Sequence, residues 1–225
     1  MSNLKMSSDY YATARRTVSD FFADVKRNGW DKTWKTSKDW GKMRMARTDL
    51  TDVTGYTFLM NGKSSAQNWT GLFKPGERVR LRFINASAMS FFDVRIPGLK
   101  MNVVQADGQD IEPVAVDEFR FAPAETYDVV VTPKDSKAYT IAAEPIDRTG
   151  FAIGTLATSE GRRGEMPAQR KRALLTMGDM NMEEMMKDDP DMEMTPADMV
   201  SGWAKAGTPK GDKALSYADL RYAGI

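Results

Sequence analysis

The segment from Tyr56 to Thr132 constrains the fold more than any other part of the chain, because short apolar stretches alternate there with turn-forming residues. Val79, Leu81 and Phe83 alternate with arginines, which is the pattern of a strand with one buried and one wet face. Turns are indicated at Asn61-Gly62, Lys74-Pro75-Gly76, Pro97-Gly98, Asp107-Gly108 and Ala122-Pro123. The predicted strands are Tyr56–Met60, Arg78–Asn85, Phe91–Ile96, Met101–Ala106, Val116–Phe121, Thr126–Thr132, Ala138–Glu144 and Phe151–Ala157. This succession predicts a mainly β protein with one Greek-key β-sandwich.

The residues before the strands read as a helical arm. Apolar side chains recur there at helical spacing, at Tyr11, Ala14, Val18, Phe21, Phe22 and Val25. Ser8 or Asp9 is expected to cap the start of this helix and Gly29 to end it. Trp30 and Trp34 stand one helical turn apart and predict a second helix. Because so much aromatic surface is costly to leave in water, we expect the arm to pack on the sandwich or to cause weak self-association.

Three regions follow from these patterns: a helical arm at residues 1–54, the sandwich at 55–160, and a methionine-rich, partly irregular and partly helical extension with a linker at 161–225. The chain holds 32 basic and 31 acidic residues, and this balance argues against a nucleic-acid partner. No apolar run reaches the roughly 18 residues of a transmembrane helix, so we expect no membrane span. The first residues lack the apolar centre of a signal peptide.

The sequence contains no histidine and no cysteine. Disulfides, iron–sulfur clusters and thiolate zinc sites are thereby excluded, together with the commonest metal ligand and the commonest general base. The Ser-His-Asp triad and the Cys-His pair are excluded for the same reason.

Methionines provide the one candidate site. Thioether sulfur is a soft ligand that suits Cu(I), and the acidic neighbours Asp179, Glu183 and Glu184 would attract a cation. If the segment is helical, two of these methionines lie one turn apart on one face. The alternative is that methionines fill gaps in an irregular packing surface. The candidate Cu(I) contacts are Met177, Met180, Met182, Met185 and Met186.

Four blocks of sequence, in order, resemble the second cupredoxin-like domain of multicopper oxidases. They are Lys74–Ser87 (KPGERVRLRFINAS), Phe92–Gly98 (FDVRIPG), Val103–Val114 (VVQADGQDIEPV) and Phe121–Val131 (FAPAETYDVVV). Residues in the arm, Ser8–Tyr11, Arg16–Phe22 and Met43–Met45, and the stretch Leu215–Leu220 are similar to the bacterial copper-resistance branch of that family. One departure is Ala124, where the family more often has glycine.

This resemblance implies a cupredoxin-like sandwich that forms the middle domain of a three-domain, periplasmic oxidase. The parent would use copper to oxidise a reductant, often cuprous ion, and to reduce dioxygen to water. The family's histidine and cysteine ligands have no counterpart in this chain, so no catalytic residue is carried over and the chain alone is expected to be inactive. Its partners would be the first and last cupredoxin domains of the same polypeptide.

Two other functions remain open from the residues alone. A stand-alone protein could buffer Cu(I) through the same methionines without electron transfer. A metal-free β-sandwich could also serve as an interaction module, since sandwiches host many functions.

Overall fold

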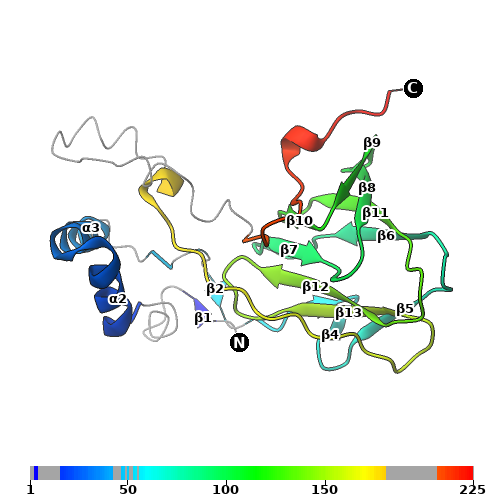
Figure 1. The fold of residues 1–225 in the computed structure, drawn as a ribbon, viewed down its shortest axis with the longest axis horizontal. Coiled ribbons are helices and arrows are strands. Elements are labelled where there is room, and N and C mark those ends of the chain that lie inside the picture. The colour runs from blue at the N-terminus through cyan, green and yellow to red at the C-terminus, as the bar shows by residue number, and fades with distance from the viewer. Residues whose placement is uncertain are drawn as a thin grey trace. The chain divides into compact units, whose positions relative to one another are not determined.

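The computed structural model describes residues 3–4, 16–42, 47–48, 50, 53–54, 56–180 and 207–224 (Figure 1). The chain divides into two compact units. One comprises Met1–Tyr56 with Arg172–Lys205, and the other comprises Thr57–Lys171 with Ala206–Ile225. Within the described ranges, no helix has the length and apolar character needed to cross a bilayer.

The second unit is a β-sandwich, which confirms the predicted fold class. Its five-stranded sheet has the order β10-β7-β12-β13-β5, and its four-stranded sheet the order β6-β11-β8-β9. The pairs are antiparallel except β13 with β5, which is parallel. The strand bounds are Trp69–Leu72 (β5), Val79–Ile84 (β6), Phe92–Arg95 (β7), Met101–Ala106 (β8), Gln109–Val116 (β9), Glu118–Phe121 (β10), Thr126–Val131 (β11), Tyr139–Pro145 (β12) and Ala152–Ala157 (β13). A short hairpin of Leu59–Met60 (β3) and Lys63–Ser64 (β4) precedes them.

The core forms between the two sheets from the alternate residues that each strand turns inward. Phe119 of β10 is fully buried, and its ring lies 5.2 Å from that of Phe83 and 5.3 Å from that of Tyr127. Burial raises the pKa of the Tyr127 hydroxyl, with the nearby Glu125 charge adding to the effect. These aromatic contacts tie β6, β10 and β11 together across the sandwich.

The predicted strand Tyr56–Met60 is shorter than expected, since β3 covers Leu59–Met60, and the predicted strand Val116–Phe121 was wrong in a second way. The expected strand Val116–Phe121 is two elements, because Val116 ends β9 and Glu118 begins β10 after a bend at Asp117. The bend moves the chain from the edge of the four-stranded sheet to the edge of the five-stranded one. Apolar and polar residues keep alternating through this bend, so the sequence pattern does not show that the chain passes from one sheet to the other.

A segment near the C-terminus returns to these two edges, and we call Lys213–Ala223 the strap. Lys213 O accepts from Asp117 N at 2.8 Å, and Leu215 N donates to Glu118 O at 2.8 Å, beside β10. Further on, Glu112 N donates to Arg221 O at 2.9 Å and Ala223 N to Asp110 O at 3.1 Å, beside β9. Leu215 and Leu220 of the strap pack against the core. The strap therefore covers one edge of each sheet and closes that side of the sandwich.

The first unit contains the helices α2 (Val18–Asn28) and α3 (Trp30–Lys42) and the two-residue strands β1 (Asn3–Leu4) and β2 (Val53–Thr54), which pair. Gly29 ends α2 at φ 86°, as predicted. The expected cap at Ser8 or Asp9 was wrong for this helix. Thr17 is the N-cap, and its side chain and that of Asp20 satisfy each other's backbone N–H.

The predicted second helix is also present. Trp30 and Trp34 of α3 stack with ring centroids 6.1 Å apart, and Phe21 of α2 meets both rings edge-on. Trp40 is 5% exposed, whereas Trp30 and Trp34 are 54% and 48% exposed. Aromatic contacts between α2 and α3 therefore hold the helix pair together while leaving about half of two tryptophan side chains in water.

Candidate functional site

Two of the five methionines predicted to contact Cu(I) lie in the described part of the chain. Met177 and Met180 are the first and last residues of the 3₁₀ helix η1, Met177–Met180. The start of this turn is capped because the Asp179 carboxylate accepts from Thr176 N at 2.7 Å and from Thr176 Oγ1 at 3.1 Å. The Asp179 carboxylate is thus already engaged as the hydrogen-bond acceptor that caps this turn. Met182, Met185 and Met186 lie outside the described residues.

The chain's donor set does not fit a resident copper centre of the histidine and cysteine type. Neither residue occurs in the sequence. Across the described residues, no three or more Asp or Glu side chains gather in a way that could hold a metal ion. Thioethers are therefore the soft donors that the chain offers to copper.

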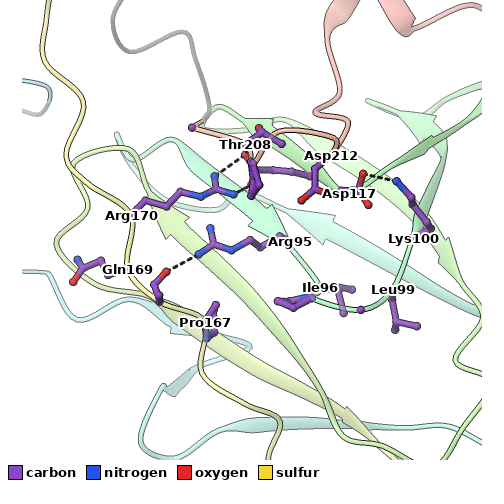
Figure 2. Close-up of a pocket in the computed structure, with 16 residues that line it drawn as sticks. Arg95, Ile96, Leu99, Lys100, Asp117, Pro167, Gln169, Arg170, Thr208 and Asp212 are labelled. Atoms are coloured by element: carbon purple, nitrogen blue, oxygen red, sulfur yellow. Dashed lines mark hydrogen bonds and ion pairs between the residues drawn. The ribbon is translucent and has the colours of Figure 1, made fainter.

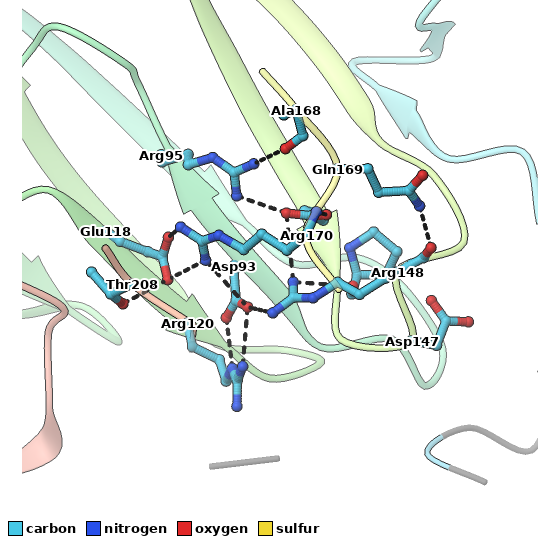
Figure 3. A network of polar contacts seen from close by, with 12 residues as sticks. Asp93, Arg95, Glu118, Arg120, Asp147, Arg148, Ala168, Gln169, Arg170 and Thr208 are labelled. Carbon is cyan, nitrogen blue, oxygen red and sulfur yellow. Dashed lines mark hydrogen bonds and ion pairs between the residues drawn. The ribbon is translucent and has the colours of Figure 1, made fainter. Parts of the chain in front are cut away.

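A cluster of buried charges lies on the outer face of the five-stranded sheet (Figure 3). Three neighbouring strands place it there: Asp93 of β7 faces Arg120 of β10 on one side and Glu144 of β12 on the other. Arg95, two residues along β7, faces Glu118 of β10. The three carboxylate side chains are 0–1% exposed.

Asp93 and Glu144 accept hydrogen bonds from arginines of neighbouring strands and of the segments that follow β12 and β13. Arg120 Nε and Nη2 lie 2.6 and 3.0 Å from the two oxygens of Asp93, and Arg148 Nη2 lies 2.6 Å from Asp93 Oδ2. Glu144 accepts from Arg95 Nη1 at 2.7 Å and from the backbone N of Arg170 at 2.9 Å. Each carboxylate thus has at least two donors, as buried anions require.

The Glu118 carboxylate is hydrogen-bonded by side chains of segments that do not belong to the sheet. Arg170 grips it with both terminal nitrogens, Nη1 at 2.8 Å from Oε1 and Nη2 on Oε2, and Thr208 Oγ1 lies 3.2 Å from Oε1. Burial acts to lower the pKa of Arg170, but its hydrogen bonds and ion pairs with the carboxylates prevail and raise it. The guanidinium therefore stays charged, and the pair is a fixed electrostatic contact.

Beside the cluster lies an open cleft of about 640 Å³ (Figure 2). Its walls come from the turn after β7, including Pro97 and Leu99, from residues 167–170, and from residues 207–209 with Asp212. Lys100 and Asp117 form an ion pair on its rim, and the hydrogen bond to Lys100 lowers the pKa of Asp117. Within the lining Arg170 pairs with Glu118 and Lys100 with Asp117, and Arg95 binds Glu144 of the charge cluster.

Sequence reasoning missed this charge cluster. The residues alternate with core side chains, Asp93 with Phe92 and Val94, and Glu118 with Phe119, so they read as a wet outer face. A signal exists in retrospect: three adjacent strands all carry charges outward, and Arg170 follows in a proline-containing stretch that could cover them. Without the strand order, nothing in the sequence shows that these positions meet.

The fold defines a cupredoxin-like β-sandwich, and comparisons with known proteins agree. Residues 7–161 match the family model described as Cu-oxidase, multicopper oxidase. The chain is 55% identical over 195 residues to copper resistance protein A of Escherichia coli. The aligned residues make up 86% of this chain and 32% of that protein. It is 56% identical over 187 residues to the copper resistance protein A homolog of Pseudomonas syringae pv. tomato, covering 82% and 32%. The crystal structure of Fet3p, a multicopper oxidase that functions in iron import, aligns with 46% of this chain and 21% of that chain, at 23% identity and a TM-score of 0.41.

The family match spans more than half of the chain, so the chain belongs to the multicopper oxidase family. It is homologous to bacterial copper resistance protein A over most of its length. It spans about a third of the length of these relatives.

Proposed function

We propose that this chain is the central, non-catalytic cupredoxin-like domain of a periplasmic copper-resistance multicopper oxidase. Its role is to hold the first and last cupredoxin domains of the parent so that copper sites form between them. One observation carries the proposal: the chain has the sandwich of the family and none of the histidine or cysteine donors that its copper chemistry uses. Copper oxidation and dioxygen reduction would belong to the parent.

The methionines give the domain a second task, the gathering of Cu(I) as a substrate. Met177 and Met180 lie at the two ends of a single 3₁₀ turn, and Met182, Met185 and Met186 follow within six residues. Support comes from the softness of thioethers and from homology to copper resistance proteins. Packing by the same methionines is the competing role.

Catalytic inactivity is tested with the purified chain, copper and a reductant in an oxygen electrode. We expect no catalytic oxygen consumption and no blue absorption of a thiolate copper site. Turnover by the chain alone would overturn the proposal.

Cu(I) gathering is tested by competition with a chromophoric Cu(I) chelator. A variant with all five candidate methionines changed to leucine is compared with Met89→Leu/Met166→Leu, whose two methionines are 47% and 54% exposed. We expect the first variant to lose Cu(I) binding and the second to retain it. Equal binding by both would favour the packing role.

The size of the native product separates a domain from a stand-alone Cu(I) buffer. An antibody to this chain should detect a band about three times larger in source cells, because the chain spans 32% of its relatives. A band at 25.2 kDa would favour the buffer.

A further inference from the structure

The two edges of the four-stranded sheet differ in what covers them. The strap forms backbone hydrogen bonds with β9 at Asp110 and Glu112, whereas β6, at the other edge, pairs with β11 alone among the described strands. The outer side of an edge strand presents N–H and C=O groups that can bind a further strand. The β6 edge is therefore the place on this sheet where another polypeptide segment can add.

The register shows which residues of β6 turn their backbone groups toward this free side. In an antiparallel pair, alternate residues bond to the partner strand and the residues between them do not. Asn85 N donates to Glu125 O at 3.1 Å, in the register that β6 and β11 keep, so the odd-numbered residues of β6 bond to β11. The N–H and C=O groups of Arg80 and Arg82 consequently point to the free side.

The side chains of the same residues make this edge basic. Arg78, Arg80 and Arg82 are exposed in a row, while the residues between them pack against the core. Among the described residues, the carboxylate paired with this row is that of Asp128, which lies 2.7 Å from Arg80 Nη2 and 3.4 Å from Arg82 Nε. The Asp128 side chain is 8% exposed, whereas that of Arg82 is 73% exposed. The row thus carries more positive charge than this one carboxylate balances.

We propose that the β6 edge binds an extended acidic segment of a partner protein, which adds as a further strand antiparallel to β6. The backbone of the segment bonds to Arg80 and Arg82, and its carboxylates, at alternate positions, face the row of arginines. Opposite charges on neighbouring strands attract, whereas two copies of this chain paired antiparallel through β6 would set arginine beside arginine. The charge of the edge therefore selects an acidic partner over a second copy, and the inference does not depend on copper binding.

Charged residues on an edge strand can also serve only to keep other strands away. The two roles are separated with a short capped peptide in which glutamate alternates with valine, titrated into the full chain and followed by amide hydrogen exchange. If the peptide adds as a strand, the amides of Arg80 and Arg82 become protected, while that of Leu81, already bonded to β11, changes little. Absence of this protection would overturn the proposal.

N-methylated peptides provide the matched control for backbone pairing. In the antiparallel arrangement the glutamates lie opposite the arginines and bond to β6 through their own N–H groups, whereas the N–H groups of the valines point away. We expect protection of Arg80 and Arg82 to be lost when the glutamates are N-methylated and kept when the valines are. Equal protection by both peptides would show that charge attraction alone brings the peptide to the chain, and would overturn the added strand.

The part played by charge is tested with Arg78→Gln/Arg82→Gln, which leaves the ion pair of Arg80 in place. Lys26→Gln/Arg27→Gln, at exposed positions of α2, is the control because it removes the same charge outside the sandwich. We expect the first variant to bind the unmethylated peptide about threefold to tenfold more weakly, and the control to bind it as the unchanged chain does. An equal affinity of the two variants, or equal binding of a peptide with lysine in place of glutamate, would overturn the selection of an acidic partner.

Discussion

Arg120 and Asp93 face each other across β10 and β7, and the guanidinium binds both carboxylate oxygens, at 2.6 and 3.0 Å. The Asp93 side chain is 0% exposed and also accepts from Arg148 at 2.6 Å. One carboxylate thus neutralises arginines from a neighbouring strand and from the β12–β13 connection. Its position ties the outer face of the sheet to that connection.

Asp93→Asn keeps the shape of the side chain and removes its charge. Because two buried guanidiniums then lose the anion that faces them, we expect the free energy of unfolding to fall by roughly 3 to 5 kcal/mol. Urea unfolding followed by amide exchange in β7 and β12 measures the loss. Glu160→Gln, on the exposed surface, should change little. A loss below about 1 kcal/mol for Asp93→Asn would mean that the cluster contributes less than its burial suggests.

Gly154→Ala tests the close packing of β13 against β5. A Cβ there would lie 2.5 Å from Sδ of Met60 and 3.0 Å from Cε3 of Trp69. We expect a loss of about 1–3 kcal/mol in thermal or urea unfolding, because neighbours must move to admit the methyl group. The same substitution at Gly41, in α3, has open space around it and should be neutral or slightly stabilising. Equal effects at the two positions would contradict the packing.

Ala124→Gly should stabilise the sandwich. Ala124 has φ 68° in the turn closed by Glu125 N and Ala122 O at 3.2 Å, a conformation that costs a residue with a Cβ about 1 kcal/mol or more. We expect a net gain of about 0.5 kcal/mol after the greater flexibility of glycine in the unfolded chain is subtracted. Ala115→Gly, in β9, should lower stability instead. A loss at Ala124 would show that the alanine is not strained.

The contact between Arg16 and Asp24 makes the helix pair sensitive to acid. Arg16 Nη1 lies 2.6 Å from Asp24 Oδ2, and this hydrogen bond lowers the pKa of Asp24 below its ordinary 3.8. Because the folded pKa is depressed, the contribution is present above pH 3.8 and is lost as the pH falls through the folded value. Carboxyl NMR titration should show a midpoint below 3.8, which Arg16→Gln raises.

Arg27→Gln serves as the comparison for that titration. Arg27 lies 3.8 Å from Asp24 and is 73% exposed, so its removal should move the midpoint less than Arg16→Gln does. A larger shift from Arg27 than from Arg16 would reverse the assignment.

The strands that the sequence identified share strong alternation and clear turns. Met101–Ala106 matches β8 at both ends, and Asn61-Gly62 and Asp107-Gly108 form tight hairpin turns with positive φ at all four residues. The residues of β9 before Val116 were not predicted as a strand, because Pro113 argues against one. The proline is tolerated there because β9 is the last strand of its sheet. Gly71 likewise conceals β5, the edge of the other sheet.

Part of the candidate site could be predicted from the sequence, and part could not. Methionine clustering is visible in the sequence because its members are neighbours along the chain. The contacts that Arg170 and Thr208 make with Glu118 cannot be seen in the sequence, because the three residues are separated by dozens of positions and share no pattern. The stretch that follows β13 carries Arg170 to Glu118, and the residues just before the strap carry Thr208 there.

The strap also sets the order in which the protein can mature. During synthesis, residues 57–171 emerge well before residues 213–223, so both sheets exist for a time with one edge bare and the spaces for Leu215 and Leu220 unfilled. Such long-range closure is slow, and bare strand edges invite pairing with other chains. The sandwich would therefore be most prone to aggregation before residues 213–223 emerge, and pairing of the strap with the two edges would end that exposure.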